Sequence, residues 1–307
     1  MTAQRRIHRR ALDGVLLLDK PSGMTSNAAL QCAKRLLNAA KAGHTGTLDP
    51  MATGLLPLTF GEATKFSQVL LDADKSYDAT LRLGVETDTG DAEGTAVTEA
   101  PVAVDLADIE RALVRFTGLI EQVPPMYSAL KRDGKPLYEY ARAGVEVERA
   151  PRQVRIHTLD LVEAVGDMIR LHVDCSKGTY IRTLATDVGR ALGCGAHLVA
   201  LRRTRIGPFD VGQAVALAAL EAAGIDERTG FLEASDLLVL HLPQMNLDGE
   251  QARAIRQGRV LDVGGDNVGP VRLYDSDRFL GLGELQPDGK LSPKRLIASS
   301  ACNETLR

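Results

Sequence analysis

The sequence predicts an α+β fold with a mixed, largely antiparallel sheet, followed by a small β-rich C-terminal domain. Segments with strand-like and helix-like hydrophobic spacing alternate irregularly along the first four-fifths of the chain, without the GxGxxG turn of a dinucleotide-binding domain. After Pro243 the sequence changes to short apolar runs separated by turn-forming residues. With 307 residues, one large domain (1–243) and one small domain (244–307) are expected.

The composition is that of a folded protein, with 44% hydrophobic and 25% charged residues. The four cysteines, Cys32, Cys175, Cys194 and Cys302, form no C-x-x-C pair, so neither a zinc ribbon nor a disulfide framework is expected. No apolar stretch approaches the roughly 18 residues of a membrane helix, and the run at 15–18 is too short for a secretory signal. We therefore expect a cytoplasmic protein without a membrane partner.

The net charge is −3, but the charges are unevenly distributed along the chain. Acidic residues concentrate between positions 72 and 99. Basic residues gather in four groups: Arg5, Arg6, Arg9 and Arg10; Lys131, Arg132 and Lys135; Arg149, Arg152 and Arg155; and Arg202, Arg203 and Arg205. Such segregation allows a basic, nucleic-acid-binding face on an acidic protein, although ordinary solvated surface charges would give the same pattern.

In chain order, residues 14–19 are an apolar run typical of a buried strand, closed by the turn Lys20-Pro-Ser-Gly23. Thr25 or Ser26 is placed to cap a helix that we expect to run to about Lys41. Residues 43–61 are dense in Gly, Thr and Pro, which predicts a loop or a series of tight turns. Residues 76–84 alternate as a half-buried strand, with Tyr77 on the apolar side.

Further along, residues 106–116 have helical spacing, and Pro124-Pro125 opens a polar insertion that extends to about Pro151 and contains a short helix at 137–143. Residues 168–175 alternate as a strand, and residues 180–192 have helical spacing that ends at Gly193. The C-terminal domain contributes strand-like runs at 271–274 and 279–285.

The segment Gly43-His-Thr-Gly-Thr-Leu-Asp-Pro-Met-Ala-Thr-Gly54 is the strongest candidate for chemistry. The ring of Pro50 disfavours the α conformation at Asp49, so the carboxylate is held on an extended backbone. The glycines allow sharp turns and the threonines supply hydroxyls. An Asp-Pro pair in a Gly-rich loop is also a common turn, so these residues alone leave a purely structural role open.

Several motifs together resemble those of the bacterial tRNA pseudouridine-55 synthase (TruB) family. They are Lys20-Pro-Ser-Gly-Met-Thr-Ser26, the Asp49 segment, Gly61-Glu-Ala-Thr-Lys65, Lys75-Ser-Tyr77, Gln122-Val-Pro-Pro-Met-Tyr-Ser-Ala-Leu-Lys131 and Cys175-Ser-Lys-Gly-Thr-Tyr-Ile-Arg-Thr-Leu184. Their order and spacing also match, over about residues 14–209. The resemblance implies the pseudouridine synthase fold, with an inserted loop at about 124–151 that clamps RNA and a PUA-like RNA-binding domain at the C-terminus.

The implied reaction is a redox-neutral isomerisation of a flipped T-loop uridine in tRNA, without a metal or organic cofactor. By resemblance, Asp49 is the nucleophile, attacking either the sugar carbon or the pyrimidine ring. Arg182 pairs with Asp49, Tyr77 stacks on the target base and Tyr180 helps to close the pocket. Each of the last three also has an ordinary interpretation, an exposed arginine at a helix start or core tyrosines.

The resemblance implies substrate-binding roles for four further groups of residues. His44 lies near the flipped nucleotide, Lys20 and Pro21 pack near the site, Leu201 lines the pocket, and Lys131, Arg132, Lys135 and Arg142 contact phosphates from the insertion. We expect a monomer that binds the tRNA elbow without a protein partner. The sequence also leaves two other functions open: an RNA-folding factor, which is compatible with catalysis, and a hydrolase of another glycosidic bond. The hydrolase requires a second acid near Asp49, for which the sequence shows no paired motif.

Overall fold

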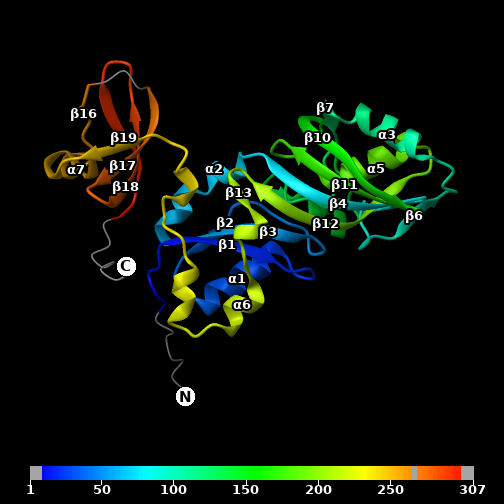
Figure 1. Cartoon of the computed structure of the whole chain (residues 1–307), viewed down its shortest axis with the longest axis horizontal. Helices are drawn as coiled ribbons and strands as arrows, with labels where there is room; N and C mark the ends of the chain where they lie inside the picture. The colour runs from blue at the N-terminus through cyan, green and yellow to red at the C-terminus, as the bar shows by residue number, and fades with distance from the viewer. Residues whose placement is uncertain (1–8, 265–267, 299–307) are drawn as a thin grey trace.

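The computed structural model describes residues 9–264 and 268–298, so Arg5, Arg6 and Cys302 lie outside the described residues (Figure 1). A ten-stranded sheet organises the first part of the chain. Its strands are β1 (Gly14–Lys20), β2 (Ala42–His44), β3 (Thr53–Phe60), β4 (Lys75–Leu83), β7 (Gly118–Gln122), β10 (Arg152–Val165), β11 (Met168–Cys175), β12 (Ala196–Ile206), β13 (Phe209–Asp210) and β14 (Val215–Ala216).

The spatial order of this sheet is β14-β1-β3-β12-β4-β11-β10-β7, with β2 paired to β3 and β13 paired to β12. Only the β1–β14 and β3–β12 pairs are parallel. The predicted mixed, largely antiparallel sheet is therefore confirmed.

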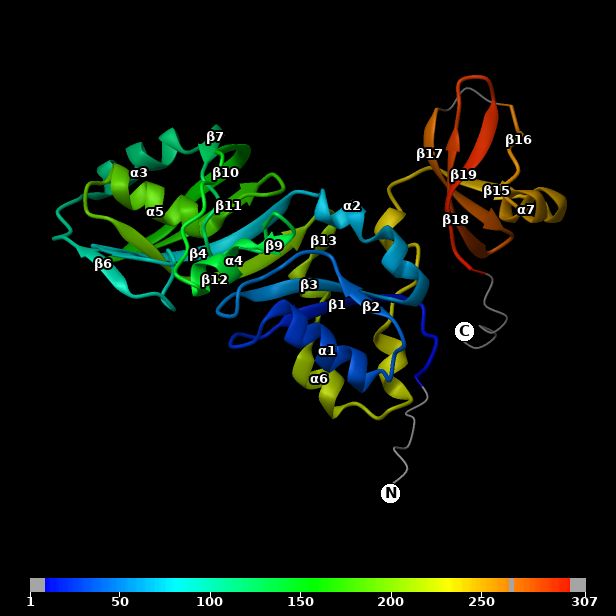
Figure 2. The same ribbon diagram turned by 180° about the vertical axis from the view of Figure 1, so that it is seen from behind.

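Four helices cover the sheet in two pairs (Figures 1 and 2). Helices α1 (Ser26–Leu36) and α6 (Leu217–Ala222) lie together near β1, whereas α3 (Leu106–Arg115) and α5 (Ile181–Ala191) lie over the half that contains β10 and β11. Smaller elements are β5 (Val85–Thr87), β6 (Ala96–Glu99), α2 (Gln68–Leu71) and the 3-10 helices η1 (Gly61–Phe66), η2 (Val211–Gln213), η3 (Glu227–Phe231) and η4 (Leu237–Val239). The insertion forms a hairpin, β8 (Lys131–Arg132) and β9 (Lys135–Pro136), followed by α4 (Leu137–Arg142).

The boundary of α1 differs from the prediction. Thr25 caps the helix as expected, because its hydroxyl accepts a hydrogen bond from the backbone N–H of Ala28 at 3.0 Å. The helix ends at Leu36 rather than near Lys41. Asn38 has a positive φ of 52°, a left-handed conformation that cannot continue a right-handed helix.

The prediction of a loop over residues 43–61 is wrong for most of that segment, because it contains the end of β2 and all of β3. β3 lies between β1 and β12, and Leu55, Leu56, Leu58 and Phe60 are fully buried. A strand that is covered on both faces has a continuous apolar run, so the alternation that marks half-buried strands is absent. Residues 45–52 form the connection between β2 and β3.

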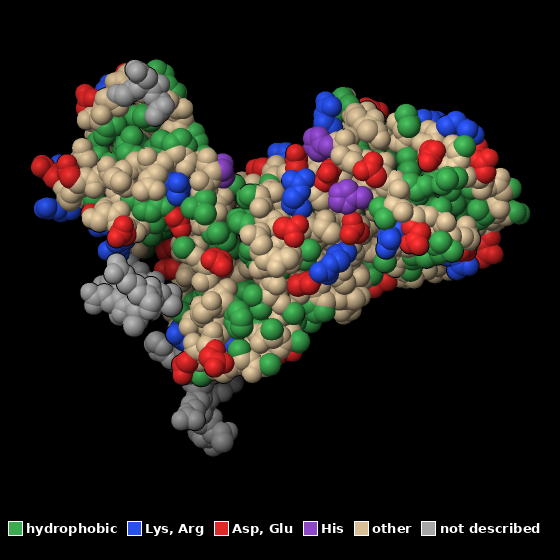
Figure 3. Space-filling model, in the orientation of Figure 1, with side chains coloured by type: hydrophobic (Ala, Val, Ile, Leu, Met, Phe, Trp, Pro, Cys, Tyr) green, Lys and Arg blue, Asp and Glu red, His purple; other side chains and the backbone are tan. Residues whose placement is uncertain are grey.

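A five-stranded sheet forms the β-rich C-terminal lobe, in the order β15-β17-β18-β19-β16. Its strands are β15 (Gln244–Leu247), β16 (Leu261–Asp262), β17 (Gly269–Asp275), β18 (Arg278–Leu285) and β19 (Lys290–Leu296), with helix α7 (Gly249–Arg256) beside them. The lobe protrudes from the large sheet (Figures 1 and 3). The ring of Phe279 lies 5.4 Å from that of Phe66, and Lys65 donates a hydrogen bond to the carbonyl of Leu296 at 2.8 Å. Apolar packing and hydrogen bonds therefore join the two parts.

On the face shown in Figure 3, Lys and Arg side chains are interspersed with Asp and Glu, so this view shows no continuous basic surface. Within residues 9–264 and 268–298, none of the helices combines the length and the apolar character needed to cross a membrane. The same residues contain no group of three or more His, Cys, Asp or Glu side chains arranged to hold a metal ion.

Candidate active site

Asp49 lies on the connection between β2 and β3, and hydrogen bonds from several directions fix this connection. The hydroxyl of Ser26 accepts from the N–H of Leu48 at 2.7 Å and donates to its carbonyl at 3.0 Å. The ammonium group of Lys20 donates to the carbonyl of Pro50 at 3.3 Å. The residues on both sides of Asp49 are therefore tied to the N-terminal strand and helix, which orients the carboxylate.

Arg182, in the first turn of α5, forms an ion pair with Asp49. Its Nε lies 2.9 Å from Oδ2 of Asp49, and its Nη2 lies 3.3 Å from Oδ1, so both carboxylate oxygens are contacted. Arg182 also donates to the carbonyls of Tyr127 at 2.6 Å and Thr89 at 3.1 Å. Only 5% of its surface is exposed, which contradicts the interpretation as an exposed arginine at a helix start. The forked guanidinium thus holds Asp49 in one orientation.

A second carboxylate, Asp91, lies on the other side of the same guanidinium. Its Oδ2 is 3.5 Å from Nη1 of Arg182, and its Oδ1 accepts hydrogen bonds from the Thr89 hydroxyl at 2.6 Å and the Glu93 N–H at 3.1 Å. The sequence shows no paired acidic motif for Asp49, but the fold places Asp91 close to it, across Arg182. Asp91 is 3% exposed and its carboxylate is occupied by these donors. A glycoside hydrolase needs a second carboxylate that can reach water, so the position of Asp91 fits a structural role instead.

Burial determines the direction of the pKa shift at Asp49. Desolvation raises the pKa of Asp49 above its usual value, and the nearby charge of Asp91 adds to this, while the Arg182 guanidinium and the Lys20 ammonium act in the opposite direction. Removal of either cation would therefore favour the protonated form of the carboxyl group.

A pocket of about 360 Å³ opens beside Asp49. Five of the predicted site residues line it, namely Asp49, Tyr77, Tyr180, Arg182 and Leu201. Tyr77 comes from β4 and is 8% exposed; burial raises its pKa, while the neighbouring Arg203 guanidinium opposes that shift. Burial likewise raises the pKa of Tyr180. Both phenols therefore offer aromatic faces and neutral hydroxyl groups to a ligand.

Three further residues build this pocket and were not predicted from the sequence. The buried side chain of Gln122 accepts a hydrogen bond from the N–H of Tyr180 at 3.0 Å and donates one to its carbonyl at 3.2 Å, which fixes the start of α5. Lys75 and Arg203 line the pocket directly. Strand alternation would have identified Arg203, because it points to the same side of β12 as Leu201.

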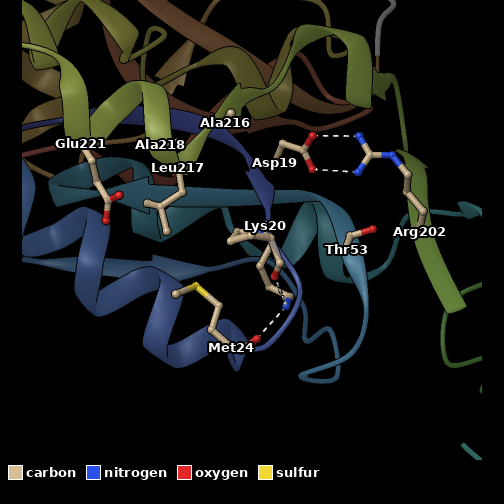
Figure 4. Close-up of a pocket in the computed structure, with 10 residues that line it drawn as sticks. Asp19, Lys20, Met24, Thr53, Arg202, Ala216, Leu217, Ala218 and Glu221 are labelled. Atoms are coloured by element: carbon tan, nitrogen blue, oxygen red, sulfur yellow. Dashed lines mark hydrogen bonds and ion pairs between the residues drawn. The ribbon is translucent and has the colours of Figure 1, made fainter. Parts of the chain in front are cut away.

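Lys20 does not line the pocket of Asp49. It lines a separate cavity of about 440 Å³ at the end of β1, where Asp19 and Arg202 form a two-pronged ion pair (Figure 4). Its ammonium group donates to the carbonyls of Pro21 at 2.9 Å and Met24 at 2.6 Å, besides that of Pro50. Burial lowers the pKa of Lys20 to about 8. In this structure Lys20 therefore holds the backbone around Asp49 rather than facing the pocket.

The remaining predicted residues lie outside the pocket. Burial lowers the pKa of His44, and its Nδ1 has no hydrogen-bond partner among the described residues. His44 lies two residues before Gly46, which does line the pocket. Lys131 and Arg132 are exposed on the β8–β9 hairpin, next to the pocket residue Leu130. This places charged side chains of the insertion near the rim.

Comparison with known proteins identifies the family. The model described as "TruB family pseudouridylate synthase (N terminal domain)" matches residues 34–181. A protein of Aromatoleum aromaticum, "tRNA pseudouridine synthase B", is 67% identical, and the match covers 97% of each chain. The chain belongs to the TruB family. A relative of the same name from Thiobacillus denitrificans is 58% identical over 95% of this chain and 98% of its own.

The other matches to this family extend to the C-terminal lobe. The model "tRNA pseudouridylate synthase B C-terminal domain" matches residues 182–242, and "Pseudouridine synthase II TruB, C-terminal" matches residues 243–297. Among solved structures, the "Crystal Structure of a Cbf5-Nop10-Gar1 Complex" contains a similar chain, with a TM-score of 0.71 and 27% identity over 96% of this chain and 88% of that one. The large sheet with its C-terminal lobe is therefore the fold of TruB-family pseudouridine synthases.

Proposed function

We propose that this TruB-family enzyme isomerises the uridine at position 55, in the T-loop of tRNA, to pseudouridine in the cytoplasm. The main support for this function is the Asp49–Arg182 ion pair on the wall of a pocket that is also lined by Tyr77 and Tyr180. The curated relatives of similar length bear the name tRNA pseudouridine synthase B, which supports tRNA as the substrate.

The reaction rearranges atoms within one nucleotide. The bond between C1′ of the ribose and N1 of uracil breaks, the base turns, and C5 bonds to C1′; the proton leaves C5 and N1 gains one. No electrons are transferred to or from an outside group, so the reaction needs no oxidant or reductant. Because a stacked uridine is out of reach of Asp49, the base must first be extruded into the pocket.

Each pocket residue has a role in this scheme. Asp49 is the nucleophile, and its attack either on C1′ or on the pyrimidine ring is compatible with the pocket. Arg182 keeps the carboxylate ionised and oriented, Tyr77 stacks on the base, and Tyr180 and Leu201 close the pocket around it. We propose His44 as a contact to the flipped nucleotide, and Lys20 as a positioning residue.

The large lobe, residues 1–243, carries the catalytic site in this proposal. The insertion, through Lys131 and Arg132, and the C-terminal residues 244–307 bind the T-arm by contacts to phosphates. We propose that a monomer suffices, and that neither a cofactor nor a protein partner is required.

The test uses an unmodified tRNA transcript and maps pseudouridine at each uridine. We expect conversion at position 55 by the wild type and by Asp160→Asn, which alters an exposed carboxylate on β10. Asp49→Asn should give no product. Absence of product with wild type, or its appearance at other positions instead, would refute the proposal.

A second role, assistance in tRNA folding, is favoured by the position of the RNA-binding candidates outside the catalytic pocket. Lys131 and Arg132 are exposed on the hairpin, and the C-terminal lobe protrudes from the large sheet at the end away from α5 (Figure 1). Asp49→Asn should therefore still accelerate refolding of a misfolded tRNA. If this variant binds tRNA but no longer accelerates its refolding, the second role is wrong.

A further inference from the structure

We infer that Arg203 contacts the substrate directly and stabilises the negative charge that develops on the uracil when its bond to the sugar breaks. This inference rests on the proposed function and assigns a second charged residue to its reaction, in addition to Asp49.

Arg203 is built into the wall of the pocket by its neighbours. It lies on β12 opposite Tyr77 of β4 and beside Gly54 of β3. Its Nε donates a hydrogen bond to the carbonyl of Leu55 at 2.7 Å, and 1% of its surface is exposed. The backbones are packed so closely that a Cβ at Gly54 would lie 2.3 Å from the carbonyl oxygen of Arg203. The guanidinium is therefore held in place before any ligand binds.

Arg203 has one buried donor atom that the protein leaves without a partner, while its guanidinium also interacts with the hydroxyl of Tyr77. Its Nη2 is buried without a hydrogen-bond partner in residues 9–264 and 268–298, and none of the ion pairs in that part of the chain involves Arg203. A buried cationic donor without an acceptor costs free energy, because the group has lost its contacts with water. An acceptor with partial or full negative charge, supplied by the substrate, would offset this cost.

The other cations near the pocket already have partners. Arg182 is bound to Asp49 and to two backbone carbonyls. Lys75 donates to the carbonyls of Leu70, Leu71 and Ala73, which accounts for the three hydrogens of its ammonium group. Among the described cations that line the pocket, Arg203 is thus the one with a buried donor left for a ligand.

The chemistry of the reaction requires such a donor. When the bond between C1′ and N1 breaks, its electron pair stays with the base, and the negative charge spreads over the ring to the carbonyl oxygens O2 and O4. When Asp49 attacks the sugar, it counters the positive character of that carbon or bonds to it. A fixed guanidinium counters the charge on the base on either route, and this contact is stronger in the transition state than in the bound uridine. On the sugar route, Asp49 and Arg203 act on opposite charges of the same cleavage.

The first part of the test compares Arg203→Gln with Arg170→Gln, a control in which an exposed strand arginine is changed. Single-turnover rates and tRNA affinities are measured on a transcript with a normal target uridine. Removing a preorganised donor for a developing anion should slow conversion by about 10²- to 10³-fold. Affinity for tRNA should change by less than about threefold, because the contact strengthens mainly in the transition state. The control should behave like wild type.

The second part uses transcripts whose target carries sulfur in place of O2 or of O4, because sulfur is the weaker acceptor. In the wild type, one of the two replacements should slow the reaction; in Arg203→Gln the same replacement should add no further loss. Arg203→Lys keeps the positive charge and should retain part of the conversion rate and part of the slowing caused by sulfur. It can therefore replace Arg203→Gln in the test if Arg203→Gln does not fold.

The two claims can fail separately. If the wild type forms no pseudouridine, the proposed function is wrong. If the wild type is active and Arg203→Gln converts the normal transcript within about threefold of its rate, the role of Arg203 is wrong. The same conclusion follows if both sulfur replacements slow wild type and Arg203 variants equally.

Discussion

The change Arg182→Gln tests the electrostatic design of the site most fully. Arg182 lies between Asp49 and Asp91, whose side chains are 34% and 5% exposed. Removing one partner of a buried ion pair costs about 3 to 5 kcal/mol, because the remaining charge is left uncompensated. Since solvent screens part of Asp49, we expect the lower end, a loss of about 3 kcal/mol in the free energy of unfolding at pH 7.

The loss should depend on pH in a defined direction. Burial already raises the pKa of Asp49, and loss of Arg182 raises it further. A carboxylate whose pKa is higher in the folded than in the unfolded protein opposes folding when it is ionised, so the variant should be least stable at high pH. As the pH falls through the folded pKa, Asp49 takes up a proton and the difference from wild type should shrink. The low-pH limit of activity should also move to higher pH.

Urea denaturation at pH 5 and pH 7 measures the first effect, and the pH dependence of the single-turnover rate measures the second. Arg190→Gln is the matched control, because Arg190 lies on the same helix and pairs with Glu86 at 3.0 Å with 63% of its side chain exposed. The free energy of unfolding of Arg190→Gln should fall by no more than about 1 kcal/mol. An Arg182→Gln protein as stable as wild type, or destabilised equally at both pH values, would show that Arg182 does not compensate the charge of Asp49.

Three further changes test other parts of the account. Gly54→Ala should lower the free energy of unfolding, measured by urea denaturation, by about 3 kcal/mol or more. The reason is that φ at Gly54 is +100° and the new methyl group would meet the backbone of Arg203. A neutral effect would contradict the observed β3–β12 packing. Phe279→Ala removes the ring contact with Phe66 and should lower the free energy of unfolding by about 3 kcal/mol. It should also expose the junction between the lobes to protease, so unchanged cleavage would argue against that junction. Changing Lys131 and Arg132 together to Gln should lower the slope of log affinity against log salt by about 1.5 to 2 in tRNA-binding titrations; an unchanged slope would show that neither residue meets a phosphate.

The sequence predicted elements well where hydrophobic periodicity was strong. Residues 168–175 match β11, and the helix expected at 180–192 is α5. β3 was missed because its composition, with Gly, Thr and Pro, indicates turns, while its burial depends on β1 and β12, which are distant in the chain. Residues 196–206 form β12 although their arginines form a basic cluster in the sequence.

The candidate site shows the same division between local and long-range information. The family motifs predicted a pair of Asp49 with Arg182, which are 133 positions apart and whose contact the fold creates. Asp91 lies in the acidic stretch between positions 72 and 99, where no sequence pattern indicated a buried carboxylate, yet the fold turns it inward onto Arg182. The position of Lys20 could not be predicted, because its partners are backbone carbonyls whose placement depends on the turn around it.

We propose that the Asp49 carboxylate performs the isomerisation and is not needed to bind tRNA. Its most direct test is the single-turnover rate of pseudouridine formation at position 55, measured for wild type and Asp49→Asn with tRNA affinity determined in parallel. We predict a rate lower by on the order of 10⁴-fold or more, as expected when a nucleophile is removed, with little change in affinity. An Asp49→Asn enzyme that keeps a tenth of the wild-type rate would show that Asp49 is not the nucleophile.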